Sequence, residues 1–254
     1  MNKIKAFSIR NFKEITRDPL SYLFCLGFPL VMLVVMTVIN DSIPPEVGMT
    51  IFRIDNLAGG IAVFGLTFVM LFVCLSAAKD RSGAFLVRLY ATPMRSVDFI
   101  TGYVIPTALL AVIQIVITFA ASLIVSLITG VRLSPVGLVL AALSLLPTVI
   151  MMISCGLLFG TLFSEKAAPG LCSVVISFAS FLGGVWFDAE STGGIILEIC
   201  DILPFFHAVK AARLATVLSF DDYFPHLSIT IIYAVLLTAA AVITFKQKMK
   251  ADLQ

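Results

Sequence analysis

The sequence predicts an all-α membrane protein, and three observations lead to that prediction. Hydrophobic residues fill 60% of the 254 positions, whereas only 13% are charged. A soluble domain of this length carries about a quarter charged residues, so too few remain here to cover a water-facing surface. The apolar residues form long runs, and lysines and arginines gather on alternate connections between those runs. These features predict a single transmembrane domain over residues 1–254 with six spanning helices.

Six apolar runs are long enough to cross a bilayer, because about 20 apolar helical residues span a hydrocarbon core roughly 30 Å thick. The runs cover residues 21–40, 57–78, 99–128, 136–163, 169–187 and 227–245. None has a charged residue near its middle, which disfavours a proton or ion path through buried charges. The third and fourth exceed the minimum length, so they are expected to tilt or to extend beyond the headgroups.

The distribution of positive charge predicts the orientation. If the six runs all cross the membrane, thirteen of the 17 lysines and arginines fall on one side and four on the other. Cytoplasmic connections carry an excess of lysine and arginine. We therefore expect a multi-pass protein of the inner or plasma membrane with both termini in the cytoplasm.

Residues 1–20 are expected to form an interfacial helix before the first span. Apolar side chains fall on one helical face and cations on the other: Ile4, Phe7, Phe12 and Ile15 against Lys3, Arg10, Lys13 and Arg17. Such a helix lies in the headgroup plane with its cations on anionic lipid, so membrane lipid is an expected partner. The alternative is an ordinary basic flank of the first span.

The connection at residues 79–98, after the second run, keeps a helical pattern and is expected to form a cytoplasmic helix. Phe85 and Leu89 share one face, Arg88 lies on the adjoining face, and Thr92-Pro93 ends the helix because a residue before proline disfavours the α conformation. A short helix with an exposed apolar patch fits a protein partner. It also fits a helix that folds back on the bundle or the bilayer, and periodicity leaves both interpretations open.

The longest segment on the opposite side, residues 188–226, is too apolar for a simple loop. Gly193-Gly194 opens the run 195–203, Pro204 interrupts it, and 205–218 continues as a second run. Neither run is long enough to span a bilayer. Two short re-entrant or interfacial helices therefore fit best.

Within the spans, small residues and a proline predict local packing. Gly156 and Gly160 form a GxxxG pattern that allows close helix approach, and we expect it to pack inside the bundle rather than in a dimer seam. Pro29 should kink the first span or free a carbonyl. Aromatic and hydroxyl side chains on the second and fifth runs are candidates for a transport pathway, although an aromatic ridge in lipid more often serves packing. They are Phe64, Thr67, Phe68, Phe72, Ser173, Ser177, Phe178 and Phe181.

Motifs for catalysis and cofactor binding are absent from the sequence. It holds no GxxxxGK[ST] phosphate loop, no HExxH and no GxSxG. His207 and His226 are its two histidines, too few for a metal cluster, and its five cysteines form no CxxC. We therefore expect no catalytic residue, no metal, no cofactor and no ATP site in this chain. No basic and aromatic run indicates nucleic-acid binding.

Four stretches together resemble the ABC-2-type permeases, the membrane subunits of one class of ATP-binding-cassette exporter. Residues 10–19 with Pro29 resemble the family's interfacial helix and first span. Residues 80–93, with Gly83, Arg88-Leu89 and Thr92-Pro93, resemble its coupling region. Gln114 matches a glutamine often found in the third span, and residues 203–209 with Ala212-Arg213 resemble the segment before the last span. The similarity extends over nearly the whole chain.

The resemblance implies a transport subunit that is not itself an enzyme. Two six-span subunits would pair, with a homodimer slightly preferred, and dock on separate ATPase subunits that bind ATP and magnesium. The implied ATPase contact is Gly83, Phe85, Arg88, Leu89, Thr92 and Pro93. Many members of the family carry acidic residues just before the glycine, whereas here Lys79 and Arg81 flank a single acid, Asp80. This pattern resembles the drug- and antibiotic-exporter branch more closely. The cargo would be hydrophobic or amphipathic: a drug, an antibiotic, a peptide or a lipid-like molecule.

Two other classes of function compete with this one. An ion-coupled secondary transporter would work without an ATPase, and the scarcity of charge in the spans counts against it. A membrane scaffold or an integral-membrane enzyme would tolerate changes at Thr92 and Pro93 and would have no ATPase partner.

Overall fold

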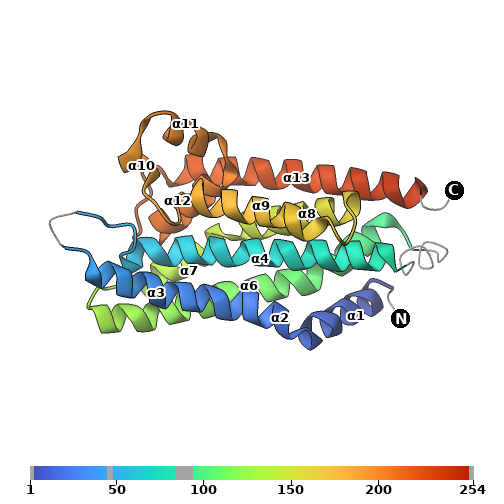
Figure 1. Ribbon diagram of the computed structural model, residues 1–254, viewed down its shortest axis with the longest axis horizontal. Helices are drawn as coiled ribbons and strands as arrows, with labels where there is room; N and C mark the ends of the chain where they lie inside the picture. Colours follow the sequence, from blue (N-terminus) through green and yellow to red (C-terminus); the bar gives the residue numbers. More distant parts are fainter. Residues whose placement is uncertain (1–2, 45–47, 84–93, 252–254) are drawn as a thin grey trace.

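The computed structural model describes residues 3–44, 48–83 and 94–251. Within these ranges every regular element is a helix, and the long helices run side by side along one axis (Figure 1). The elements in chain order are α1 (Lys3–Arg17), α2 (Pro19–Tyr22), η1 (Leu23–Gly27), α3 (Phe28–Ser42), α4 (Ile54–Ser82), α6 (Ser96–Thr129), α7 (Pro135–Ser144), α8 (Leu146–Leu162), α9 (Ala168–Phe181), α10 (Ala189–Thr192), α11 (Gly194–Ile202), α12 (Pro204–Thr216) and α13 (Tyr223–Ala251).

Five helical segments of the described chain are long and apolar enough to cross a membrane. They are Pro19–Ser42, Ile54–Ser82, Ser96–Thr129, Pro135–Leu162 and Tyr223–Met249. They coincide with five of the six predicted runs, and they confirm the all-helical membrane class. Their outer surfaces are apolar: Val31 on α3 and Leu236 on α13 are each more than half exposed, as expected of side chains that face lipid.

The predicted fifth span is shorter than its apolar run. Helix α9 has 14 residues, a length of about 21 Å, whereas a bilayer core is about 30 Å thick. The helix ends because Gly183 and Gly184 follow, and Gly184 has φ +67°, a conformation that side chains disfavour. Val185 beyond the turn still lies against Gly60, near the start of α4. A sixth complete crossing remains a prediction.

Helix α4 is the central helix of the bundle, with 22 of its 29 residues buried, and it packs against α3, α6, α8, α9 and α12. Gly156 and Gly160 of α8 face its backbone. A Cβ at Gly160 would lie 2.6 Å from the Cys74 carbonyl oxygen, and one at Gly156 would overlap the Met70 carbonyl. The GxxxG pattern therefore packs inside the bundle, as predicted.

Prolines interrupt two of the spans. The π-helical turn η1 ends two residues before Pro29. In a regular α-helix the Pro29 ring would clash with the carbonyl of Cys25, and the wider turn relieves that clash. The predicted fourth span likewise divides into α7 and α8 at Leu145, two residues before Pro147.

The segment after α9 forms three short helices rather than two. Asp188 caps α10, Gly193 and Gly194 adopt positive φ between α10 and α11, and α11 ends at Ile202 before Pro204 opens α12. The predicted breaks at the glycine pair and at Pro204 are confirmed. Whether these helices enter the membrane stays a prediction. They lie at the opposite end of the bundle from α1 and the end of α13 (Figure 1).

Candidate functional site

A network of hydrogen bonds and ion pairs between helices surrounds Asp80, in the last turn of α4. Asp80 is only 4% exposed and lies at the end of an apolar span, where an unpaired carboxylate would be costly. Tyr103 of α6 donates its hydroxyl hydrogen to Asp80 Oδ2 at 2.7 Å. Arg10 of α1 supplies the positive charge: its two terminal nitrogens donate to Oδ2 at 2.5 Å and Oδ1 at 2.6 Å. The carboxylate is thus satisfied by two helices other than its own.

Local packing places Arg10 in this position. Its neighbour Asn11 donates to the Gly102 carbonyl of α6 at 3.0 Å. The Phe7 ring, one turn earlier, covers Gly102 so closely that a Cβ there would overlap it, and it packs edge-on against Tyr103 at 5.1 Å. Phe7, Asn11 and Ile15 make up the buried face of α1 with Ser8, while Phe12, predicted on the apolar face, is 41% exposed.

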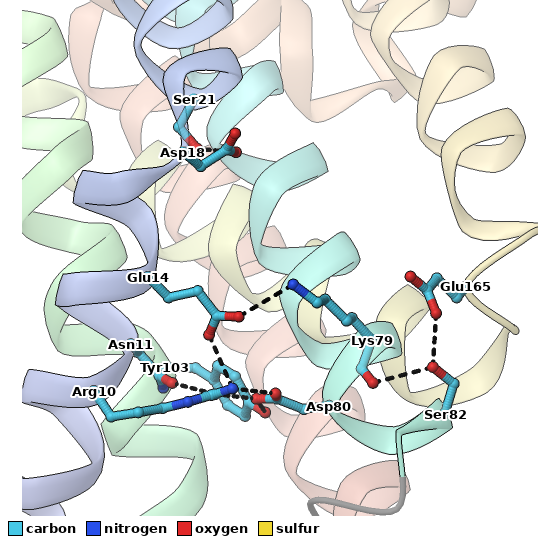
Figure 2. A network of polar contacts seen from close by, with 10 residues as sticks. All are labelled: Arg10, Asn11, Glu14, Asp18, Ser21, Lys79, Asp80, Ser82, Tyr103 and Glu165. Carbon is cyan, nitrogen blue, oxygen red and sulfur yellow. Dashed lines mark hydrogen bonds and ion pairs between the residues drawn. The ribbon is translucent and has the colours of Figure 1, made fainter.

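Further contacts extend the network to the connection between α8 and α9 (Figure 2). Glu14 pairs with Arg10 at 3.0 Å and with Lys79 at 3.4 Å. The Ser82 hydroxyl donates to Glu165 Oε2 at 2.7 Å. The last turn of α4 is therefore held by α1, by α6 and by the residues that precede α9.

Opposing charge keeps Arg10 firmly ionised. Partial burial disfavours its charge, but hydrogen bonds from Arg10 to Asp80 and the negative charges of Asp80 and Glu14 outweigh that effect, so the pKa of Arg10 is raised. The forked guanidinium matches a carboxylate in a bidentate geometry that lysine cannot reproduce. Arg10 therefore carries its positive charge throughout the physiological pH range.

The network ends where the predicted coupling contact begins. Gly83 caps α4, with its N–H donating to the Lys79 carbonyl at 2.9 Å, and it is exposed. The other predicted contact residues, Phe85, Arg88, Leu89, Thr92 and Pro93, lie outside the residues that the structure describes.

The two halves of the predicted transport pathway lie on different surfaces. Phe64, Thr67, Phe68 and Phe72 of α4 are buried within the protomer. Phe64 and Phe68 pack against Phe24, Phe28 and Trp186, which supports the packing interpretation for this ridge. In contrast, Ser173, Ser177, Phe178 and Phe181 line a shallow apolar groove of about 430 Å³ on the outward face of α9. Both serines donate to backbone carbonyls one turn earlier in α9.

A second polar cluster lies at the opposite end of the bundle. Arg213 of α12 donates to the carbonyls of Asn56 at 2.9 Å and Gly184 at 2.8 Å, and burial lowers its pKa to about 10 despite the nearby charges of Asp188 and Glu190. These hydrogen bonds join α12 to the start of α4 and to the turn after α9. Asn56, Gly184 and Arg213 line a cavity of about 150 Å³, which is too small for a drug-sized ligand.

The two histidines, His207 and His226, form a pair beside this cluster. His207 Nδ1 lies 2.7 Å from His226 Nδ1, and His207 Nε2 lies 2.7 Å from the Asp201 carbonyl. A carbonyl only accepts, so His207 Nε2 carries a hydrogen. In the neutral pair His226 Nδ1 then donates to His207 Nδ1, which links α13 to α12.

Sequence patterns do not predict the Asp80 network. They place Arg10 on the cationic face of an interfacial helix and Tyr103 within the apolar run 99–128. The available signal was Asp80 itself: a single acid at the end of a central span requires a cation and a donor nearby.

In the described part of the chain, a bundle of five helices long and apolar enough to cross a membrane defines the class as that of multi-pass integral membrane proteins. The family model of the ABC-2 type transporter matches residues 2–216, so the chain belongs to that family. A curated relative from Bacillus subtilis (strain 168), named "Putative transport permease YvfS", is 23% identical over 216 residues, which cover 82% of each chain.

Proposed function

We propose that the chain is the membrane-spanning permease subunit of an ATP-driven exporter, which obtains ATP hydrolysis from a separate ATPase subunit. The observation that carries the proposal is the network around Asp80. It ties the end of the central helix α4, one turn before the first predicted ATPase-contact residue Gly83, to three other parts of the bundle. Family membership supports the same assignment.

In this mechanism the ATPase contacts residues 83–93 and moves the end of α4. The bidentate Arg10–Asp80 pair makes α1 move with α4. The hydrogen bond from Tyr103 to Asp80 makes α6 follow, and the Ser82–Glu165 bond does the same for the connection that precedes α9. Helices of a packed core shift as rigid units between discrete arrangements. A displacement at one end of α4 is thereby passed to the helices around it.

The proposed cargo is hydrophobic or amphipathic. The only groove with an apolar lining that we assign to transport is the one on α9, and its two serine hydroxyls are already occupied by backbone carbonyls. In a paired permease this face would meet its counterpart around the axis of a homodimer. The α4 aromatics would then support the pathway from behind rather than line it.

The proposed orientation puts both termini in the cytoplasm and counts α9 with its following turn as the sixth crossing. Two facts support it: α1 and the end of α13 lie at the same end of the bundle, and most lysines and arginines fall at that end. ATP and magnesium would be bound by the ATPase, and the permease itself would need no cofactor.

Inside-out membrane vesicles test the energy source. Vesicles from cells that make the chain with its ATPase should accumulate an amphipathic fluorescent dye when ATP is added, vanadate should block the uptake, and a protonophore should not. The variant Asp80→Asn should retain the bound ATPase but take up dye more slowly, with Glu198→Gln as the matched control. Uptake driven by an ion gradient without ATP would support the secondary transporter instead.

A further inference from the structure

An open groove of about 750 Å³ runs beside α1, at the junction of α1, the start of α2 and the end of α4. The span that begins at Pro19 and the span that ends at Ser82 both meet it. Because each span leaves the hydrocarbon core near these residues, the groove lies at the level of the lipid headgroups. Its position follows from the fold and not from any assumption about cargo or an ATPase.

Positive charge predominates in this groove. Arg10, Lys13, Arg17 and Lys79 line it together with the acids Glu14 and Asp18. Glu14 is already engaged with Arg10 and Lys79. Asp18 accepts from the backbone N–H of Leu20 and from the Ser21 hydroxyl. The acids in the groove therefore have partners within the chain.

Two of the cations lack such partners. Lys13 and Arg17 are exposed, one turn apart on α1, and neither forms an ion pair with any residue in the described parts of the chain. Residues four apart lie on one face of a helix, so both side chains can reach the same anion. A phosphate would accept hydrogen bonds from both, and the guanidinium of Arg17 suits it in a bidentate geometry.

The remaining wall of the groove is apolar. Ile9 and Pro19 line it, Ile9 is 44% exposed, and the adjacent Leu20 is 54% exposed. A soluble anion would gain nothing from such a surface, whereas the glycerol and first methylenes of a lipid would cover it. The combination of paired cations and exposed apolar side chains thus favours a lipid over a free phosphate.

We propose that this groove binds the headgroup phosphate of one anionic phospholipid of the surrounding leaflet. Lys13 and Arg17 hold the phosphate, and the acyl chains run along Leu20 at the start of the first span. The bound lipid adds a further attachment for α1, which Arg10 and Asp80 fasten to α4. The lipid is therefore a structural partner of the helix that the network couples to α4.

Native mass spectrometry of the full-length chain in an uncharged detergent tests the proposal by titration with phosphatidylglycerol. The double variant Lys13→Gln/Arg17→Gln should weaken phosphatidylglycerol binding by about tenfold, because each basic side chain near a membrane contributes to the attraction of anionic lipid. The matched control Lys246→Gln/Lys248→Gln removes two exposed charges near the end of α13 and should leave the affinity within about twofold. The swap Lys13→Arg/Arg17→Lys keeps both positive charges and should retain the phosphatidylglycerol affinity of the parent chain.

Each other result overturns the assignment. Equal affinity in the double variant and its control would place bound lipid elsewhere. Equal affinity of the chain for phosphatidylcholine and phosphatidylglycerol would show that the negative net charge of the lipid plays no role in binding. Displacement of phosphatidylglycerol by an equal concentration of glycerol 3-phosphate would indicate a site for soluble anions. Release of a co-purified protein by Lys13→Gln/Arg17→Gln, with lipid affinity unchanged, would make the groove a protein contact.

Discussion

Arg10 and Asp80, which are 70 positions apart, form a bidentate ion pair that fastens the N-terminal helix α1 to the end of the central helix α4. The two partners differ in burial: the Arg10 side chain is 34% exposed and that of Asp80 only 4%. Because of this difference, replacing Arg10 and replacing Asp80 should change the stability of the fold by different amounts. The difference in burial also explains why the pair is placed at the end of a span, where one partner can reach the headgroup layer.

Replacement of Arg10 should cost more stability than replacement of Asp80. Arg10→Ala leaves a buried carboxylate with only the Tyr103 hydroxyl described beside it, and we expect a loss of about 2–4 kcal/mol in the free energy of unfolding. Asp80→Ala leaves a half-exposed guanidinium that water and Glu14 can satisfy, at about 1–2 kcal/mol. A double-mutant cycle in mild detergent should give a coupling energy of about 1–3 kcal/mol. Additive effects would mean that the pair contributes no mutual stabilisation.

Addition of one methyl group to α8 should disrupt its packing on α4. Gly160→Ala puts a Cβ 2.6 Å from the Cys74 carbonyl and 2.8 Å from the Ala77 Cβ, so α8 must move away. We expect a loss of about 1–3 kcal/mol in thermal unfolding experiments. Gly170→Ala is the matched control, because nothing lies within 4 Å of its Cβ position. It should be neutral or slightly stabilising, and an equal effect of both changes would contradict the close approach.

Loss of the histidine pair should loosen α12 from α13. His226→Leu removes the group that donates to His207 Nδ1 and should cost about 1–2 kcal/mol. Cys200 is fully buried beside Phe206, whose ring contacts His226 edge-on. In a chain that retains only Cys200 as a cysteine, maleimide labelling should therefore be faster with His226→Leu. Exposed Glu198→Gln on the same short helix should leave the labelling rate unchanged. Unaltered labelling with His226→Leu would show that the pair does not hold this region.

The cap of α10 should give a specific pH dependence. Partial burial opposes ionisation of Asp188, but hydrogen bonds from Ser191 and Glu190 and the charge of Arg213 outweigh it, so the pKa of Asp188 lies below its ordinary 3.8. A carboxylate of this kind stabilises the fold fully above pH 3.8, and that contribution is lost as the pH falls through the lower folded-state pKa. Asp188→Ala should cost about 1 kcal/mol near neutrality. The difference in the free energy of unfolding between the parent and Asp188→Ala should shrink in acid. A difference that stays constant with pH would rule out a charged cap at Asp188.

Long-range pairing is what the sequence could not reveal. The apolar runs and the breaks at Pro29, Gly193 and Pro204 were predictable because they depend on local length and backbone chemistry. The early end of α9 depends on the positive φ of Gly184, and hydropathy counts both glycines as part of an apolar run. The Arg10–Asp80 pair and the histidine pair join distant segments. A lone acid at the end of a span indicates that a cation lies nearby, but a single sequence does not identify which residue supplies it. The two predicted halves of the pathway shared a composition, but they do not share a surface.

Affinity purification of the tagged chain from its native membrane tests the central claim most directly. The account predicts that an ATP-binding-cassette ATPase co-purifies with the parent chain and is lost with Arg88→Glu/Leu89→Glu, while Lys246→Glu/Lys248→Glu at the end of α13 retains it. An intact chain that transports its cargo with no ATPase in any sample would contradict the account and support an ion-coupled transporter.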